Sequence, residues 1–194
     1  MHKTFVLPLM MVLVVWVAGV KAAGNDSAAI DVNALSHLLL RDQASTVRFH
    51  ELQYRKILTA PVERSGELVF QPPDVFIKRV LKPGAEEYKL EGDTLTIQMG
   101  ERKARRLSTR NQPLLRGLML SFQSVVSGQL SALEPYYTLQ TSGNASKWQL
   151  MLEPKDAEIK KYVERVVVDG RDSNPLRFEV IERSGDRTVT EIEP

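Results

Sequence analysis

The sequence predicts an α+β domain composed mainly of antiparallel β-strands, with one long helix in the middle of the strand order. Short runs of alternating apolar and polar residues follow one another along the chain, separated by Gly, Pro and Asp, as in an antiparallel meander. One central segment has the period of a helix instead. We count about ten or eleven strands, and a single sheet of that size must curl or close. Its concave face could hold a helix, a ligand or both.

The N-terminal segment has the features of a secretory signal peptide, which we predict over residues 1–22. Lys3 gives a charged start, and the apolar run from Phe5 to Val20 is shorter than the roughly 20 residues of a membrane-spanning helix. Val20-Lys21-Ala22 fits the small-residue cleavage rule, and an uncleaved membrane anchor is the alternative. We therefore expect an exported protein whose residues 23–194 form a single domain. It has no cysteine to carry the acyl groups of a lipoprotein.

The composition excludes several functional classes. The chain has 26 basic and 24 acidic residues, and removal of residues 1–22 would leave 24 of each, since that segment contains Lys3 and Lys21 and no acidic residue. This neutral balance argues against nucleic acid as a partner. The absence of cysteine excludes disulfides and thiol chemistry. The whole chain is 43% hydrophobic, so a mature chain of about 170 residues can bury a core.

The first element predicted after the signal peptide is a helix, for which Asp31 is a suitable N-cap. A long strand follows over residues 46–58. Its apolar side chains change parity between Phe49 and Leu52, so we expect a β-bulge near residues 50–51.

Further strands continue the meander. Turn residues bound each of them, including Pro83-Gly84 and a Gly-Asp hairpin turn at residues 92–93. We predict these strands over residues 67–71, 75–82, 86–91 and 94–98.

The central segment from Leu114 to Val126 predicts the main helix. Gly117 lies inside it and should cost about 1 kcal/mol relative to Ala. Two interpretations stay open: a core helix packed permanently against the sheet, and a lid over the concave face whose apolar side contacts lipid when cargo is bound. An apolar stripe with helical spacing contains Leu115, Leu118, Met119 and Phe122.

The pattern returns to strands after this helix. A short helical turn is predicted over residues 129–133, and one or two turns over residues 155–162. The remaining strands are predicted over residues 137–141, 148–152, 163–168, 176–182 and 188–192.

Residues that could carry catalysis or hold a metal are sparse. Only His37 and His50 remain outside the signal peptide, and there is no Gly-x-Ser-x-Gly elbow, no His-x-x-x-His pair and no glycine-rich phosphate loop. We therefore expect no enzymatic activity, no metal and no cofactor.

A basic run contains Arg102, Lys103, Arg105 and Arg106. One interpretation is a solvated edge strand that its charges protect from aggregation. The other is a surface that meets anionic headgroups or an acidic partner protein.

The order of several short patterns resembles the periplasmic outer-membrane lipoprotein carrier family (LolA-like). The resemblance rests on the segment FHELQYRKILTAPVERSGELVFQPPDVFIKRVLKP, on EGDTLTI after it, and on Trp148-Gln149-Leu150 with Leu152-x-Pro154. The carriers proper tend to have an aromatic residue where this chain has Lys78, which indicates a divergent branch. Positions that match the broader pattern of the first segment are Phe49, Leu58, Pro61, Gly66, Leu68, Phe70, Pro73, Phe76, Lys78, Val80 and Pro83.

This resemblance implies an incompletely closed, eleven-stranded half-barrel whose helices cover a hydrophobic cavity. Such proteins carry acyl chains across the periplasm without chemistry. Contact with a partner or a lipid headgroup would involve Lys78, Arg102, Lys103, Arg105 and Arg106. The cavity and its lid would be formed by Phe49, Leu68, Phe70, Phe76, Val80, Leu95, Ile97, Leu115, Leu118, Met119, Phe122, Trp148, Leu150 and Phe178.

The partners that the resemblance implies are the acyl chains of a lipoprotein or of another envelope lipid, an inner-membrane exporter and an outer-membrane acceptor. We expect a monomer. The alternative function is an envelope protein-interaction or lipid-sensing module with the same curled-sheet fold.

Overall fold

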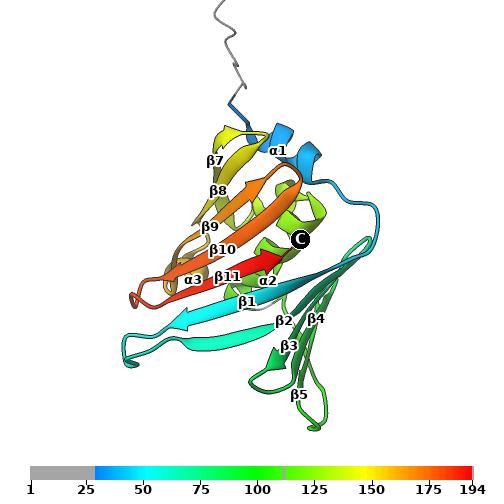
Figure 1. The fold of residues 1–194 in the computed structure, drawn as a ribbon, viewed down its shortest axis with the longest axis vertical. Helices are drawn as coiled ribbons and strands as arrows, with labels where there is room; N and C mark the ends of the chain where they lie inside the picture. Colours follow the sequence, from blue (N-terminus) through cyan, green and yellow to red (C-terminus); the bar gives the residue numbers. More distant parts are fainter. Residues whose placement is uncertain (1–28, 111, 194) are drawn as a thin grey trace, which may run out of the picture.

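A single curved antiparallel sheet of eleven strands dominates the computed structural model, which describes residues 29–110 and 112–193 (Figure 1). The predicted signal peptide lies outside the described residues. Within the described ranges, no helix combines the length and apolar character that crossing a bilayer requires.

The helices and strands follow the order that the sequence predicts. The helices are α1 (Val32–Leu39), α2 (Pro113–Ser127), the 3₁₀ helix η1 (Leu130–Leu133) and α3 (Ala157–Lys160). The strands are β1 (Ser45–Tyr54), β2 (Val62–Gln71), β3 (Val75–Lys82), β4 (Glu86–Glu91), β5 (Thr94–Met99), β6 (Arg105–Ser108), β7 (Tyr137–Asn144), β8 (Lys147–Pro154), β9 (Val163–Arg171), β10 (Asn174–Glu182) and β11 (Arg187–Glu193).

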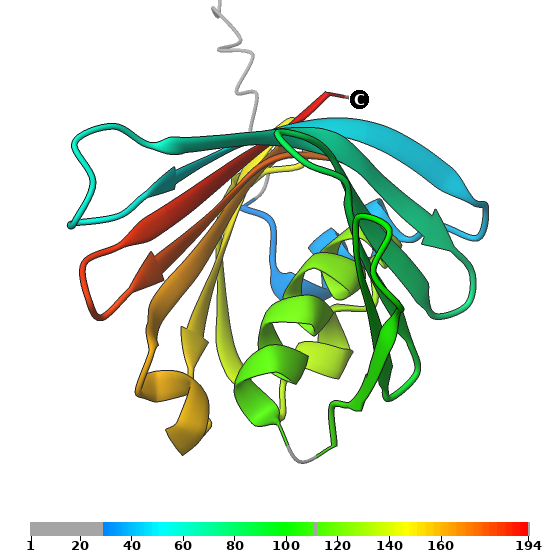
Figure 2. The same cartoon turned by 90° about the horizontal axis from the view of Figure 1, so that it is seen from below.

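The sheet has the order β6-β5-β4-β3-β2-β1-β11-β10-β9-β8-β7, so the first and last strands pair in its centre. The edge strands β6 and β7 are consecutive in the chain but lie at opposite ends of this order. The connection between them contains α2 and η1, and it crosses the concave face (Figure 2). The architecture is therefore an open half-barrel with a helix inside its curve, as predicted.

Local signals in the sequence explain where the helices begin and end. The Asp31 side chain accepts a hydrogen bond from the Ala34 N–H at 2.8 Å and caps α1. Pro113 occupies the first turn of α2, where its missing N–H costs nothing. Gly128 ends α2 with a left-handed φ of +77°, which glycine adopts without strain.

The β-bulge predicted near residues 50–51 is wrong. Strand β1 pairs with β2 and with β11 in continuous register. Phe49, Glu51 and Gln53 therefore point to the concave face, and Leu52 points to the convex face. The prediction rested on the change of parity from Phe49 to Leu52, whereas in the structure Glu51 takes the buried position of a regular strand, with its carboxylate paired with Lys78.

An irregularity occurs instead between β2 and β3, where the register shifts at Ser65/Gly66. A side chain at Gly66 would collide with the backbone of Arg79. Glycine at this position therefore allows β2 and β3 to approach closely at the register shift.

The core lies between the concave face and the helices. Large side chains from strands on both halves of the sheet are buried there together with residues of α1 and the second half of α2. The convex face is covered instead by ion pairs, such as those of Arg79 with Glu67 and Glu87, each at 3.0 Å. Partly exposed apolar and polar side chains therefore meet between the concave face and α2.

Candidate functional site

A groove with a volume of about 290 Å³ lies between the first half of α2 and the concave face of the sheet. Its apolar wall comes mainly from the helix and contains Phe76, Leu115, Leu118, Met119, Phe122 and Val180. Its polar wall comes from the sheet and contains Glu51, Gln53, Arg55, Arg64, Lys78, Tyr88, Glu182 and Thr188. Two walls of opposite character suit an amphiphilic ligand, with apolar contacts for affinity and a few polar groups for orientation.

The second half of α2 is anchored in the core. A side chain at Gly128 would collide with the backbone of Leu39 and Leu40, so the end of α2 packs directly on α1. The Gln123 Nε2 donates a hydrogen bond to the Asp74 carbonyl at 2.7 Å. This half therefore agrees with the interpretation of α2 as a core helix.

The first half of α2 has a different environment. Leu115, Leu118, Met119 and Phe122 are only half-buried, although they belong to the most apolar side of the helix. They cover the groove rather than filling it. The two interpretations of α2 thus apply to different halves of one helix, and the half that covers the groove is the one with exposed apolar surface.

The Phe122 ring connects the groove to the core. It stacks on Phe178 with a centroid distance of 4.4 Å and on Phe76 with a centroid distance of 6.2 Å. The Lys78 Nζ lies 5.8 Å from the Phe122 ring centroid and 5.0 Å from the Phe49 ring centroid, within cation–π range. Lys78 therefore extends along aromatic surface into the groove.

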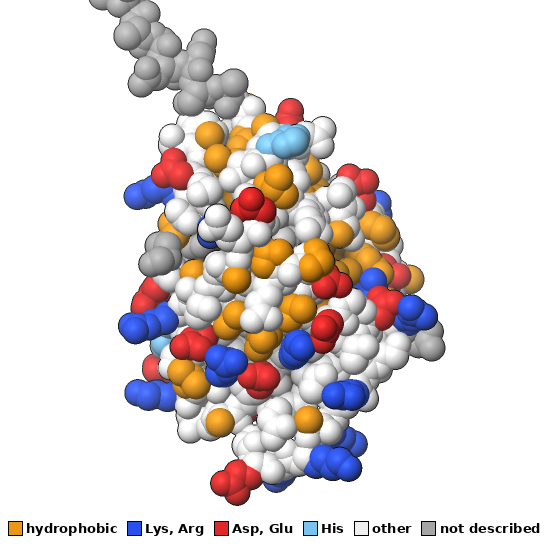
Figure 3. Space-filling model, turned by 90° about the vertical axis from the view of Figure 1, so that its right-hand side faces the viewer, with side chains coloured by type: hydrophobic (Ala, Val, Ile, Leu, Met, Phe, Trp, Pro, Cys, Tyr) orange, Lys and Arg blue, Asp and Glu red, His pale blue; other side chains and the backbone are white. Residues whose placement is uncertain are grey.

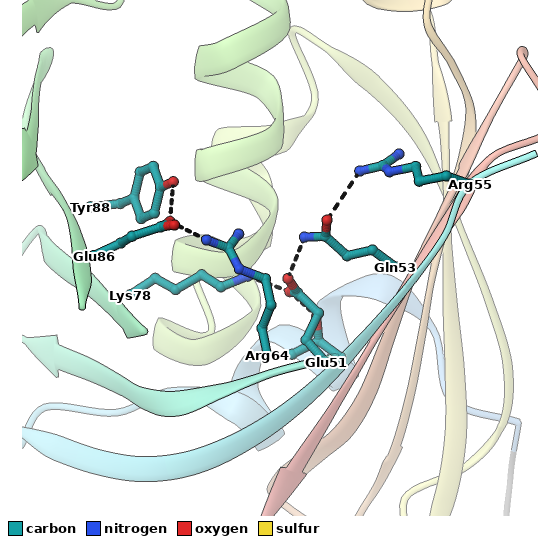
Figure 4. Close-up of polar contacts among 8 residues, drawn as sticks. Glu51, Gln53, Arg55, Arg64, Lys78, Glu86 and Tyr88 are labelled. Atoms are coloured by element: carbon teal, nitrogen blue, oxygen red, sulfur yellow. Dashed lines mark hydrogen bonds and ion pairs between the residues drawn. The ribbon is translucent and has the colours of Figure 1, made fainter. Parts of the chain in front are cut away.

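Glu51 is the most buried charged group of the groove, with 1% of its side chain exposed (Figure 4). Its carboxylate forms an ion pair with Lys78 and accepts hydrogen bonds from Thr190 Oγ1 at 2.8 Å and Gln53 Nε2 at 2.9 Å. Burial raises the pKa of Glu51, but the positive charge of Lys78 and these hydrogen bonds outweigh burial, so the pKa lies below its usual value. Glu51 is therefore ionised at neutral pH.

A second polar group, labelled in Figure 4, surrounds Arg64. Its guanidinium pairs with Glu86, whose carboxylate also accepts a hydrogen bond from the Tyr88 hydroxyl at 2.7 Å. Burial and this hydrogen bond raise the pKa of the Tyr88 hydroxyl.

Arg55 is the third basic residue of the groove wall. Its guanidinium forms an ion pair with Glu182 at 2.6 Å. Arg55, Arg64 and Lys78 thus each have a carboxylate partner, which makes the described groove wall polar but close to neutral in charge.

The residues predicted to form the cavity and its lid fall into two sets. Phe76, Leu115, Leu118, Met119 and Phe122 line the groove. Of the others, Ile97 is half-buried and the rest are buried in the core: Phe49, Leu68, Phe70, Val80, Leu95, Trp148, Leu150 and Phe178.

The polar wall was missed by the sequence reasoning except for Lys78. One signal was present: Glu51 and Gln53 share the parity of the core residue Phe49 in an unbroken strand. Thr188 and Val180 pair with each other at the same level of β11 and β10. Polar residues on the core-facing side of several strands indicate a solvated groove rather than a bulge.

The residues predicted to contact a partner or headgroup lie in two different places. Lys78 lies in the groove with 17% of its side chain exposed. Arg102, Lys103, Arg105 and Arg106 lie in the β5–β6 loop and at the start of the edge strand β6, and all four are exposed. The structure does not bring Lys78 together with the basic run.

A larger hollow of about 550 Å³ lies at the other end of the sheet. Residues of β7, β8, β9 and β10, among them Gly143, Trp148 and Asp169, line it, and the Ile30 N–H donates to the Gly143 carbonyl beside it at 3.0 Å. It is separate from α2 and its wall is partly backbone. We therefore take the smaller groove beneath α2 as the candidate site.

Among residues 29–110 and 112–193, no group of three or more acidic or histidine side chains is placed to hold a metal.

Three solved structures are similar to this chain at low sequence identity. A LolA superfamily protein from Nitrosomonas europaea is 11% identical, with 84% of this chain and 90% of that chain covered and a TM-score of 0.43. A DUF1329 family protein from Desulfovibrio piger is 16% identical, with 84% and 89% covered and a TM-score of 0.48. The MucA/MucB complex of Pseudomonas aeruginosa is 11% identical, with 84% and 56% covered and a TM-score of 0.43.

No curated protein sequence matches the chain. The family model described as "Outer membrane lipoprotein carrier protein LolA-like" matches residues 23–192, which include every described helix and almost all of the sheet. The open eleven-stranded sheet with its enclosed helix agrees with that match, and the chain belongs to the outer membrane lipoprotein carrier protein LolA-like family.

Proposed function

We propose that this protein is a periplasmic carrier that shelters the acyl chain of a lipoprotein or another envelope lipid in the groove beneath α2 and transfers it between membrane partners. The observation that carries the proposal is the half-exposed apolar side of α2 above the groove. Each methylene group removed from water contributes about 0.8 kcal/mol. An acyl chain therefore needs such a shelter to cross an aqueous compartment, and no bond has to be made or broken.

The polar wall favours a cargo that is amphiphilic within the groove itself. An acyl chain would lie against Leu115, Leu118 and Met119, while polar atoms of the cargo would face Lys78 and Arg64. A volume of about 290 Å³ is at the lower end of the range for ligand pockets. A cargo with more than one long chain would require the first half of α2 to move outward.

Export through the predicted signal peptide is part of this proposal. It brings the carrier to the compartment between an inner-membrane exporter and an outer-membrane acceptor. N-terminal sequencing of the protein isolated from the periplasm should give a chain that starts at Ala23 or Gly24. A start at Met1 would contradict export by cleavage.

Binding of an acyl ligand tests the central claim. Protein isolated from the periplasm should carry lipid in native mass spectrometry, and the delipidated protein should bind a fluorescent fatty acid. Leu118→Asp places a charge in the apolar wall and should weaken this binding at least about tenfold. The matched control is Leu81→Asp, which changes a side chain that is 53% exposed on the convex parity of β3. A protein that is always empty and binds no acyl probe would overturn the proposal.

The alternative is a protein-interaction or sensing module, and the observation that favours it is the basic run. Among the described residues, Arg102, Lys103 and Arg105 have no ion-pair partner, and Arg106 has only a longer-range attraction to Glu91. Arg105→Glu with Arg106→Glu should then abolish binding of a purified acidic partner and leave acyl binding unchanged. Loss of acyl binding together with partner binding would count against this alternative.

A further inference from the structure

The exposed large apolar side chains gather at one end of the half-barrel. In the antiparallel sheet, β1, β3 and β5 end on the side where β2 and β9 begin. Among residues 29–110 and 112–193, seven large apolar side chains are exposed, and six of them lie on the strand ends and loops of that side: Ile57, Leu58, Val62, Leu81, Met99 and Tyr162. The seventh, Leu40, follows α1 at the opposite end. We call the end with the six residues the apolar rim.

The loop from Arg55 to Pro61 between β1 and β2 projects beyond the sheet at this rim (Figures 1 and 2). Ile57 is 92% exposed and Leu58 is 46% exposed. The loop is nevertheless held in place, because the Lys56 N–H donates to Asp186 Oδ1 at 2.9 Å and Arg55 pairs with Asp186 and Glu182. A supported loop that presents two aliphatic side chains to solvent is built to contact something apolar.

The charges at the apolar rim are mostly positive. Exposed cations surround the apolar residues, and none of them has a carboxylate within ion-pairing distance in the described part of the chain: Lys56, Lys82, Arg102, Lys103, Lys155, Lys160 and Arg183. On the face drawn in Figure 3, Lys and Arg side chains project around the lower end, with fewer Asp and Glu side chains and scattered apolar ones among them. The protein as a whole has almost no net charge, so this excess is local.

We infer that the apolar rim docks on an anionic bilayer surface, with Ile57 and Leu58 entering the interface between headgroups and acyl chains. Isolated aliphatic side chains surrounded by lysine and arginine fit a lipid surface, which supplies apolar depth and negative charge together. A protein partner fits less well, because lysine is depleted in protein interfaces and the apolar residues here are spread over the ends of several strands. The groove opens on the same side, since Arg55 and Glu182 belong both to its wall and to the rim.

This inference does not depend on what the groove binds, and vesicle flotation tests it separately. The probe is a vesicle of phosphatidylglycerol and phosphatidylcholine in equal parts, compared with phosphatidylcholine alone. Wild-type protein should float with the anionic vesicles, bind the neutral ones weakly, and be released by high salt. The pair Ile57→Asp and Leu58→Asp should lower the affinity at least about tenfold. Leu40→Asp, which changes an apolar residue of similar exposure at the other end, should bind like wild type.

Because the chain has no cysteine, a single label can report insertion directly. An environment-sensitive dye on Ile57→Cys should shift its emission to the blue with anionic vesicles, whereas the same dye on Leu40→Cys should not. Equal flotation of wild type and the loop variant, or no blue shift at position 57, would overturn the inference. The variants share the same N-terminal segment, so any contribution of that segment cancels. Uptake of a soluble acyl probe by the loop variant should equal that of wild type, which separates failed docking from failed cargo binding.

Discussion

At the scale of single residues, the buried pair of Glu51 and Lys78 distinguishes this groove from a purely hydrophobic cavity. Glu51 is almost completely buried and Lys78 is mostly so. Removing two charges from water is costly, and the attraction between them compensates only when further hydrogen bonds satisfy both groups. Thr190 and Gln53 supply those hydrogen bonds to the carboxylate.

Breaking the pair should therefore be much more harmful than replacing it. Lys78→Met leaves Glu51 buried without its cation and should lower the free energy of unfolding by about 3–5 kcal/mol. The double substitution Glu51→Leu with Lys78→Met should remain within about 1 kcal/mol of wild type or exceed it. Urea denaturation measures the free energy of unfolding of both variants. As a control, Lys89→Met breaks a more exposed ion pair with Glu91 and should cost less than about 1 kcal/mol. Equal losses for Lys78→Met and Lys89→Met would contradict this account.

The same pair makes stability dependent on pH. The pKa of Glu51 is lower in the folded protein than in the unfolded chain, so the unfolded chain binds more protons in the acid range. The contribution of Glu51 is fully present above the ordinary Glu pKa of about 4.3 and is lost as the pH falls through the lower folded value. The unfolding free energy of the Glu51→Leu, Lys78→Met variant should decline less steeply below that pH than that of wild type. Parallel declines would show that other carboxylates carry the acid sensitivity.

At the scale of elements, Gly117 has a different role in α2 from the one that helix propensity suggests. A Cβ at this position would lie 2.5 Å from Ile159 Cδ1 and 3.1 Å from the Tyr137 hydroxyl oxygen. Glycine therefore lets α2 approach α3 and β7 closely. This contact holds one side of the helix, while the other side covers the groove.

A pair of substitutions tests this close packing. Gly117→Ala gains about 1 kcal/mol in helix propensity but overfills the contact, which typically costs about 1–3 kcal/mol, so a net loss is expected. Ile159→Val removes the atom that the new methyl group would meet. It should cost about 0.5–1.5 kcal/mol in the wild-type background and be neutral or stabilising in the Gly117→Ala background. Chemical denaturation of all four proteins gives the coupling energy. Simple additivity would mean that the two side chains do not conflict.

At the scale of the whole molecule, the chain order creates the groove. Strands β6 and β7 lie at opposite edges of the sheet, so the chain between them must cross the concave face. That crossing places α2 inside the curve. The same antiparallel order brings the open side of the groove, the β1–β2 loop and the basic loops to one end of the sheet.

Cargo binding should stabilise the whole fold, because the ligand binds only where α2 and the sheet are assembled. A fatty-acid probe present at about 100 times its Kd should raise the unfolding free energy by about 2.7 kcal/mol. Thermal unfolding with and without the probe measures this effect. The Ile57→Asp, Leu58→Asp variant should show the same stabilisation, whereas Leu118→Asp should show little. An equal response of Leu118→Asp and wild type would place the ligand outside the groove.

Sequence patterns predicted the elements well because each depends on local chemistry. Asp31 caps α1, Pro113 begins α2 and Gly128 ends it, and these signals act within one helical turn. The apolar side of α2 was also visible in the sequence. The polar wall was not, because the partners of Glu51 come from β3 and β11, which are distant in the chain.

The sequence by itself determined the α+β class, the long central helix, the apolar stripe that covers the groove, and the resemblance to the carrier family. The first three follow from periodicity and turn residues that act over a few positions, and the resemblance rests on the order of several short patterns. Only the tertiary structure decided that β1 is regular with a buried carboxylate, that Lys78 lies in the groove and not with the basic run, and that six apolar side chains share one end of the sheet. The physical reason is that burial, ion pairing and shared surfaces depend on which strands become neighbours, and the eleven-strand order sets these distances independently of separation along the chain.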